Sequence, residues 1–417
     1  MDDPGPPSAP TVTDVLVVGA GPAGVAAAVT LRASGRDVML VDKATFPRDK
    51  CCGDGLTTLA LRELEALGFE PLMVRDWQVV DGAVLRSPSG RQVTVRLPTG
   101  ARAGTYAAVA PRRQLDAALV DLASAAGVDV RTGHGFDGRL DQHHDHAVVG
   151  LGGHEAVAAR YVIAADGMWS PVRRAAGLTE AGYLGEWHAF RAYARGVTGP
   201  AAEQLHVWFE PDLLPGYAWS FPLPNGRVNI GFGVLRDGSR RIQDMKQQWA
   251  DLLDRPHIRA AIGAHAALED RHTAWPIPAR IDRATLSAGR VLLVGDAAAA
   301  TDVMTGEGIG QALLTGRLAA EAVVAAGAVD PAAARRHYGR AVRHHLVADH
   351  RMSAALGRVL AHERGARGAI GLLDRCGDWS RRSFARWMFE DEPRALLLTP
   401  SRWHRRPLAR PGVWVHG

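Results

Sequence analysis

The sequence predicts an α/β fold: a parallel-sheet domain assembled from both ends of the chain, an antiparallel-sheet domain inserted into it, and a C-terminal helical region. Apolar, β-branched strands of the buried type occur at 14–19, 37–42 and 290–296. Between them, at about 180–274, the composition shifts to strands rich in aromatic residues. After residue 330 the pattern is helical and rich in arginine.

Domain boundaries follow these shifts in pattern. With 417 residues the chain can bury a large core in two or three domains. Only the acidic, proline-rich start, residues 1–13, is expected to be disordered. We predict the parallel-sheet domain at 11–75, 101–178 and 275–328, the antiparallel-sheet domain at 76–100 and 179–274, and the helical region at 329–417.

The composition is that of a globular protein, with 47% hydrophobic and 22% charged residues. Three cysteines argue against a disulfide framework and favour a reducing compartment. The start of the chain lacks the basic and apolar segments of a secretory signal, and no run approaches the roughly 18 apolar residues of a membrane span. We therefore expect a cytoplasmic protein with no nucleic-acid partner.

The first strong motif is "GAGPAG", a G-x-G-x-x-G pattern that directly follows a strand and opens a helix. Its glycines permit a tight turn, a close approach to a pyrophosphate and close helix–strand packing, and the helix start turns its positive end toward phosphates. An aspartate ends the second strand, where it accepts hydrogen bonds from ribose hydroxyls and disfavours a 2′-phosphate. The motif predicts FAD or NAD, held by Gly19, Gly21, Pro22, Ala23, Gly24, Asp42 and Lys43.

Later motifs resemble the flavin fingerprints of glutathione-reductase-type flavoproteins. In "VLLVGDAA" the aspartate is expected to bind the ribityl chain, and the helix opened by "TGEGIG" to point its positive end at the flavin pyrimidine. "AADGMWSPVRR" resembles a third fingerprint, and "PRRQLDAAL" an arginine helix that reaches the FAD phosphate or ribose. The resemblance implies FAD, bound also by Arg112, Asp166, Gly167, Gly295, Asp296, Gly306, Glu307, Gly308 and Ile309.

Over most of residues 12–325 the chain resembles the geranylgeranyl reductase family, a branch of the para-hydroxybenzoate-hydroxylase-like flavoproteins. "PRDKCCGDGLT" is similar to the family's "PRDKPCGGG", whose cysteine lies near the flavin ring. Alignment on Gly53 places Cys52 on that cysteine and Cys51 on the family's proline. The resemblance implies that Cys52 and Gly53 line the flavin pocket, and Cys52 either protonates the substrate or only lines the pocket. No CxxC or histidine spacing accompanies the pair, so we predict no metal site.

A second family motif lies in "PGYAWSFPLPNGRVNIGFG", residues 215–233, which matches Y-x-W-x-F-P followed by G-x-G. Alternation puts Tyr217, Trp219 and Phe221 on one face of a strand. A plain sheet core has the same pattern, but the matching spacing favours a wall for a flat, apolar substrate. We predict that these three residues bind the substrate and that Cys52, Tyr217 and Trp219 are catalytic.

The resemblance implies an FAD-dependent oxidoreductase that reduces carbon–carbon double bonds of an isoprenoid or polyene substrate. Reduced FAD delivers hydride from N5, and Cys52 or Tyr217 supplies the proton. The alternative is a flavin monooxygenase, either a hydroxylase or an epoxidase, or a dehydrogenase that tailors a polyketide-type natural product in a bacterium. Halogenation is disfavoured because residues 53–245 contain no lysine and "YAWSFP" departs from W-x-W-x-I-P.

Two further expectations concern partners. The chain has no second Rossmann motif, so NAD(P)H binds transiently as reductant or another electron donor replaces it. The formal net charge of +5 is concentrated toward the C-terminal end. That basic, tryptophan-bearing region either makes peripheral contact with a membrane and helps to fetch a lipid, or is a docked helix with a loose tail.

Overall fold

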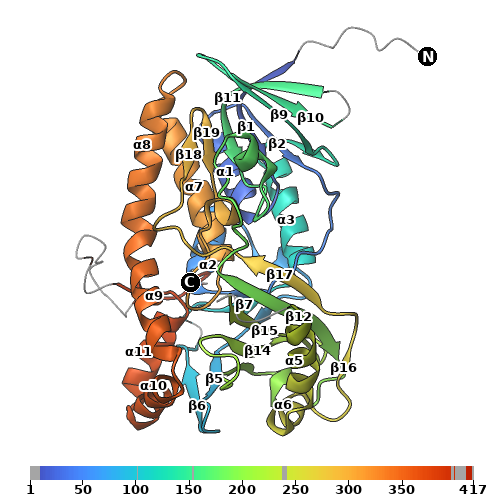
Figure 1. The fold of residues 1–417 in the computed structure, drawn as a ribbon, viewed down its shortest axis with the longest axis vertical. Coiled ribbons are helices and arrows are strands. Elements are labelled where there is room, and N and C mark those ends of the chain that lie inside the picture. The colour runs from blue at the N-terminus through green and yellow to red at the C-terminus, as the bar shows by residue number, and fades with distance from the viewer. Residues whose placement is uncertain are drawn as a thin grey trace.

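The computed structural model in Figure 1 describes residues 10–100, 102–152, 155–236, 242–395, 399 and 410–415. Most of the stretch predicted to be disordered, and most of the basic tail beyond residue 400, lie outside the described residues. Thr11 to Thr13 were included in the disordered stretch, which is wrong, since they begin the first strand. One sheet and its helices occupy the upper half of Figure 1, a second sheet occupies the lower half, and the C-terminal helices run down one side of both.

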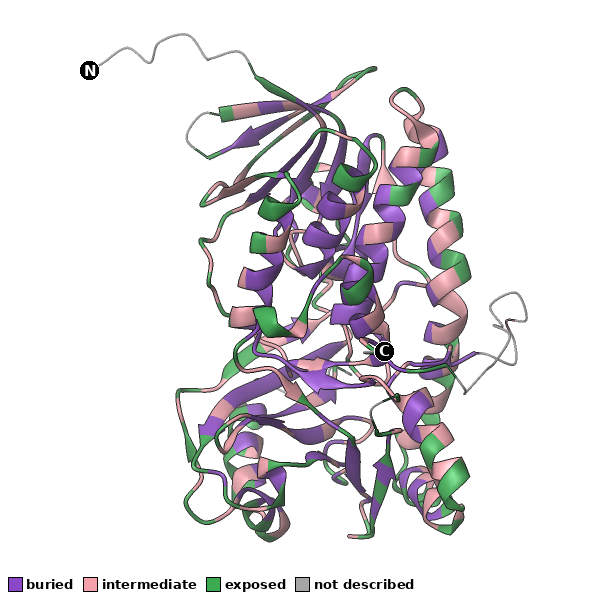
Figure 2. Ribbon diagram, turned by 180° about the vertical axis from the view of Figure 1, so that it is seen from behind, coloured by how far each residue is buried: buried purple, intermediate pink, exposed green. Residues whose placement is uncertain are grey.

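The first sheet has the strand order β18-β19-β11-β1-β2-β8, with β9 and β10 off its edge. β1 pairs in parallel with β2 and β11, and β11 with β19, so both ends of the chain meet in one sheet, as predicted. Figure 2 shows these central strands buried, because helices cover them. The strands are β1 (Thr11–Val18), β2 (Val38–Asp42), β8 (Asp129–Thr132), β9 (Phe136–Gln142), β10 (Ala147–Leu151), β11 (Glu155–Ala164), β18 (Ser287–Ala288) and β19 (Val291–Leu293).

The helices of this half are α1 (Pro22–Ala33), α2 (Thr58–Ala66), α3 (Arg112–Ala125), α4 (Pro171–Ala175) and α7 (Ile309–Ala326). α1 packs along α7, and both belong to the same apolar core as the strands. The third glycine of the first motif is needed where the turn after β1 leads into α1, because a Cβ on Gly24 would lie 1.8 Å from the carbonyl oxygen of Gly19.

The second sheet has the order β16-β12-β15-β14-β13-β5-β6, with β17 paired to β12. The sequence predicted an antiparallel sheet, but one pair of strands differs from this prediction: β5 and β13 run parallel. Two separate segments of chain enter this sheet, so no hairpin dictates their relative direction. Its strands are β5 (Gly82–Arg86), β6 (Gln92–Arg96), β12 (Trp187–Arg195), β13 (Leu205–Trp208), β14 (Tyr217–Leu223), β15 (Arg227–Leu235), β16 (Ala267–Leu268) and β17 (Thr273–Ile277).

Two smaller layers complete this half. α5 (Ile242–Asp254) and α6 (Pro256–Ile262) share an apolar core with one face of the second sheet. Between the two large sheets lies a three-stranded sheet of β3 (Gly55–Leu56), β7 (Ala108–Val109) and β4 (Gln78–Val79). β3 directly follows the paired cysteines, so this small sheet holds the cysteine loop between the domains.

The C-terminal region is helical, as predicted, with α8 (Pro331–Val342), a π-helical turn (Arg343–Val347), α9 (Ala348–Leu360), α10 (Glu363–Arg375) and α11 (Asp378–Met388). α8 packs on α7, whereas α10 and α11 pack on β6 of the second sheet. The chain then returns to the first domain, where the Phe389 carbonyl accepts a hydrogen bond of 2.8 Å from the Thr58 backbone N–H. The region therefore bridges both domains.

One helix has the length and apolar composition of a membrane span, although the sequence predicted no such segment. α7 has 18 residues and a mean hydropathy of 1.2, which is long and apolar enough by length and composition. Of that window 67% is buried inside the protein, and α7 packs against α1. These contacts identify it as a core helix.

Candidate active site

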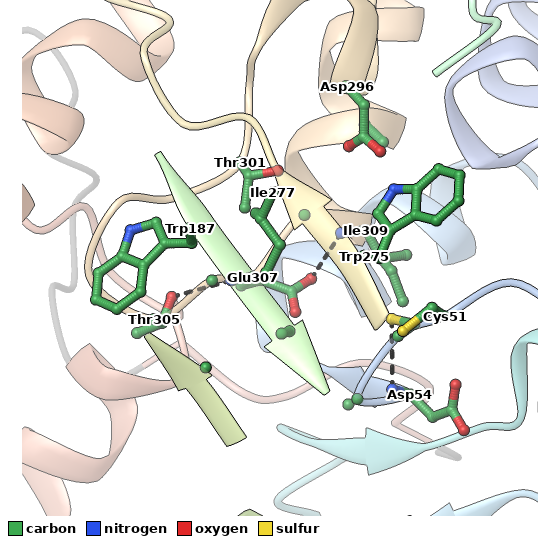
Figure 3. A pocket seen from close by; sticks show the side chains of 18 of the residues that line it. Cys51, Asp54, Trp187, Trp275, Ile277, Asp296, Thr301, Thr305, Glu307 and Ile309 are labelled. Carbon is green, nitrogen blue, oxygen red and sulfur yellow. Dashed lines mark hydrogen bonds between the residues drawn. The ribbon is translucent and has the colours of Figure 1, made fainter. Parts of the chain in front are cut away.

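A cavity of about 1300 Å³ lies where the two domains and the C-terminal helices meet. Pockets for one drug-sized ligand measure roughly 300–1000 Å³, so this cavity has room for a cofactor and a substrate. Figure 3 shows Cys51, Asp54, Trp275, Asp296 and Glu307 around it. Every residue predicted to bind cofactor or substrate lies in its wall except Gly24, which packs beneath it.

The nucleotide end of the cavity is formed by the first β-α-β unit. The carboxylate of Asp42 accepts hydrogen bonds of 2.8 Å from the backbone N–H groups of Ala20 and Ala44, which hold it at the strand end. The start of α1 at Gly21 has no side-chain cap, so its positive end is open toward a phosphate. Oδ1 of Asp166 is buried and has no hydrogen-bond partner in the part of the chain that the structure describes. An uncapped helix start and an unpaired carboxylate oxygen fit the phosphates and hydroxyls of FAD.

Two charged residues expected to contact FAD are held by protein partners. Asp296 pairs with Lys50 at 2.8 Å. Burial favours a raised pKa for Asp296, but the Lys50 ammonium outweighs it and the pKa lies below its ordinary value. Arg112 forms a bidentate pair with Asp116 at 2.7 and 2.8 Å. Both predicted ligands line the cavity, but the fingerprints did not indicate that each is already neutralised by a neighbour.

The start of α7 also differs from the prediction that its positive end faces the flavin freely. Oε1 of Glu307 accepts hydrogen bonds of 3.0 Å from the backbone N–H groups of Ile309 and Gly310. Figure 3 shows this carboxyl beside the helix start. Burial, together with the nearby Glu390 carboxyl, raises the pKa of Glu307 to about 8. A carboxyl that holds its proton leaves the local field of the helix start positive.

Both cysteines of the loop line the cavity, but their thiols have different partners. Sγ of Cys52 accepts a hydrogen bond of 3.4 Å from the Asp54 backbone N–H, and burial raises the pKa of this thiol to about 11. Cys51 instead donates to the Thr273 carbonyl at 3.7 Å, on the inserted domain. Cys52 therefore keeps its proton at neutral pH, next to the cavity.

Tyr217, Trp219 and Phe221 alternate along β14 and form a continuous aromatic face. Successive ring centroids are 6.0 and 6.1 Å apart. The cysteine loop lies directly on this face, because a Cβ added to Gly53 or Gly55 would meet a Phe221 ring carbon at 3.3 or 3.0 Å. A side chain at either position would crowd the Phe221 ring.

Tyr217 is a weaker proton donor than predicted. Its hydroxyl donates to the Thr305 carbonyl, and burial, reinforced by Glu307 and Asp302, raises its pKa far above the ordinary value. Of the two predicted donors, Cys52 is the one whose proton makes no hydrogen bond to a backbone carbonyl in the described structure. The geometry therefore favours Cys52.

Comparison with known proteins identifies the family of the chain. The family model for the FAD binding domain matches residues 12–315. The menaquinone reductase of Mycolicibacterium smegmatis is 36% identical over 79% of this chain and 82% of its own length. Digeranylgeranylglycerophospholipid reductase 1 of Methanopyrus kandleri is 34% identical over 75% of this chain and 80% of its own.

The chain belongs to the geranylgeranyl reductase family. It is an FAD-dependent oxidoreductase, and the predicted cofactor and family are confirmed. A geranylgeranyl bacteriochlorophyll reductase-like protein of Thermoplasma acidophilum shares the fold, with a TM-score of 0.75 at 20% identity over 94% of this chain and 97% of that one. A flavin-dependent halogenase, at a TM-score of 0.69 and 21% identity over 96% of this chain and 74% of that one, shows the same fold and no more.

The sequence did not predict that α9, α10 and α11 form a wall of the cavity. Its members are apolar, and they include Leu356, Val359, Leu360, Ile370, Leu373, Phe384, Trp387, Met388 and Phe389. Apolar positions at helical spacing in "SFARWMF" were the available signal. The tryptophans and arginines of this stretch instead suggested either a membrane surface or a docked helix, and neither interpretation placed the stretch in the cavity.

Proposed function

We propose that the protein hydrogenates carbon–carbon double bonds in the isoprenoid chain of a prenylated lipid or quinone. The observation that carries this proposal is the position of the Cys52 loop: it lies against the aromatic face of β14, inside a cavity that continues from the nucleotide end. Relatives are named for menaquinone and for digeranylgeranylglycerophospholipid, both of which carry isoprenoid chains. The apolar wall of α9–α11 suits such a chain.

The FAD site we propose is of the glutathione-reductase type. The turn at Gly19 and Gly21 and the start of α1 would hold the pyrophosphate, and Asp42 the ribose. Asp166 would use its unpaired Oδ1 on the nucleotide. Bound and reduced, FAD supplies the hydride. The donor that reduces it is NAD(P)H, bound transiently, or a separate redox protein.

The protein's own groups position the chain, exclude water and supply a proton. Tyr217, Trp219 and Phe221 give the double bond a flat apolar surface. The Cys52 thiol holds its proton at neutral pH and gives it to the carbon that does not receive hydride. The Arg112 guanidinium is among the charges around this thiol and favours the thiolate that proton transfer leaves.

We also propose that the C-terminal helices make peripheral contact with an anionic membrane. Val359, Leu372 and Trp379 are 54%, 64% and 70% exposed on α9, α10 and α11. These helices also form the apolar wall, so a lipid could pass from the bilayer to the cavity. Flotation with anionic against neutral vesicles tests this contact, and equal binding to both would contradict the role of charge.

Anaerobic incubation of dithionite-reduced holoenzyme with menaquinone tests the proposed reaction. We expect flavin reoxidation and a product heavier by two hydrogens. Reoxidation only by oxygen, with an oxygen atom added to an aromatic or polyene substrate, would instead support the monooxygenase. No reaction with menaquinone or a geranylgeranyl lipid would count against the proposal.

A further inference from the structure

A buried polar network ties the cysteine loop to the inserted sheet. The Cys52 carbonyl accepts hydrogen bonds from Asn229 Nδ2 at 2.8 Å and from Arg191 Nε at 3.1 Å. The carboxylate of Asp54, two residues on, accepts from the same Asn229 Nδ2 at 2.8 Å and from the Tyr193 hydroxyl at 2.5 Å. Asn229 and Asp54 are both 0% exposed. Buried donors and acceptors of this kind are costly to leave unpaired, so the network fixes the loop firmly.

The same amide also holds the aromatic face. Oδ1 of Asn229 accepts a hydrogen bond of 3.1 Å from Trp219 Nε1. Asn229 lies on β15, directly opposite Phe221 on β14. One side chain therefore bonds the backbone of the proposed proton donor and the indole of the proposed substrate platform.

The loop would not hold this shape unaided. Asp54 has φ +64°, a left-handed conformation that an aspartate adopts only at some cost. The bonds from Asn229 and Tyr193, and a second clamp from Arg191 to Asp49 at 3.0 Å, offset that cost. All three clamping residues belong to the inserted domain, on β12 and β15. The loop carrying Cys52 is thus held by the inserted domain as well as by its own, where the Asp54 carbonyl accepts from the Ala110 backbone N–H at 2.9 Å.

We propose that Asn229 is a positioning residue that fixes Cys52 and the Trp219 indole relative to each other through one amide. The proposal rests on the proposed function, because it assumes that these two groups act on the substrate. Without the amide, the Cys52 carbonyl loses one of its two clamps and the indole loses its acceptor. The loop that carries the thiol would then be held less firmly against the platform.

The test is the rate at which iodoacetamide alkylates Cys52 in the full-length, FAD-loaded protein, followed by peptide mass spectrometry so that Cys51 and Cys376 are scored separately. Asn229→Ala should raise the Cys52 rate by about tenfold with FAD retained, since loss of a buried hydrogen-bond partner is worth about that factor. Asn225→Gly is the matched control. Asn225 is exposed, in the turn that joins the same two strands, with φ +63°, which glycine accepts. It should leave the rate unchanged.

A double-mutant cycle separates positioning from general loosening. Trp219→Phe keeps a ring but loses the N–H, and should raise the alkylation rate about threefold alone and add nothing to Asn229→Ala. The pH profile of alkylation should also move toward that of an ordinary thiol in Asn229→Ala, because burial is then relieved. Of the groups that face the thiol, Arg112, Glu307 and Tyr217 are unchanged in that variant, whereas Asp54 loses the hydrogen bond from Asn229.

An unchanged alkylation rate in Asn229→Ala, or independent effects of the two substitutions, would overturn the proposal. Should Asn229→Ala fail to fold, Trp219→Phe decides alone, and an unaltered rate overturns it. The proposed function fails separately: a wild-type enzyme that reduces no double bond defeats that function, while the alkylation result still reports on the network. In an active enzyme, Asn229→Ala should lower kcat about tenfold.

Discussion

The two ends of the cavity are built in opposite ways. At the nucleotide end the wall is polar, and Asp42 is held by Ala20 and Ala44 within a single β-α-β unit. At the substrate end the wall is aromatic and apolar, and it joins β14, the cysteine loop and α9–α11, which are distant in sequence. The first end can be recognised from a local motif, whereas the second exists only when the whole chain is folded.

This difference predicts which property a substitution at each end should change. A change at the nucleotide end should abolish cofactor binding, because the backbone itself forms the site and has no room to adjust. A change at the substrate end should alter turnover or affinity while FAD stays bound. Substitutions that reverse these outcomes would break the comparison.

The largest effect is expected from Gly24→Ala. The new Cβ would lie 1.8 Å from the Gly19 carbonyl oxygen and force α1 away from the turn. Affinity for FAD should fall by more than about 100-fold, measured by flavin fluorescence during titration of the apoprotein. Gly368→Ala is the control, since Gly368 lies on α10 with nothing within 4 Å of a Cβ. Equal FAD affinity for the two variants would show that the turn is more adaptable than its packing indicates.

Cys52→Ala should give the next largest effect, at the point where the two ends meet. Removal of the proposed proton donor should lower kcat about 100-fold with FAD still bound. Cys51→Ala is the matched control: its thiol makes one bond of 3.7 Å to the Thr273 carbonyl, and its loss should be nearly silent. Full activity in both variants would leave Cys52 as pocket lining only.

The same contrast explains what could be predicted from the sequence. The glycine turn, the aromatic face and the strands predicted at 14–19, 37–42 and 290–296 all follow local patterns. The structure contains each of them, although the last strand is shorter than predicted, since β19 ends at Leu293. The parallel pairing of β5 with β13 could not be predicted, because it depends on how two distant segments dock. Nor could the partners of Arg112 and Asp296, or the bond from Asn229 to Cys52, since motifs name ligands and omit the neighbours that hold them.

Phe384→Ala sharpens the substrate side of the comparison. Phe384 lines the cavity from α11 and lies 5.7 Å, ring to ring, from Trp387. Loss of this apolar surface should raise KM for a long isoprenoid substrate about tenfold. A short-chain analogue that does not reach α11 should be unaffected, and so should FAD affinity. Val329→Ala, at a position 86% exposed beyond α7, is the control. A KM that rises equally for both chain lengths would place Phe384 in the scaffold.

Glu307→Gln probes the boundary between the two ends and should have the smallest effect. Burial and the nearby Glu390 carboxyl raise the pKa of Glu307 from 4.5 to about 8 in the folded protein. At a pH between these two values the folded protein therefore holds a proton that the unfolded chain has released. Glu307 therefore does not lower the free energy of unfolding below about pH 4.5. As the pH rises toward 8 this free energy falls, by at most about 1.4 kcal/mol per pH unit.

Glutamine has nearly the same shape as glutamate but cannot ionise. Glu307→Gln should therefore flatten the fall in unfolding free energy in a urea-unfolding series from pH 5 to 8. Glu390, whose pKa burial raises to about 7, contributes a slope of the same sign that remains in the variant. Glu321→Gln is the control on the same helix, since that carboxyl is 50% exposed and pairs with Arg317. An identical pH slope in wild type and Glu307→Gln would mean that Glu307 is ionised in the folded protein. The start of α7 would then present negative charge to the cofactor, and stabilisation of the reduced flavin would have to come from elsewhere in the site.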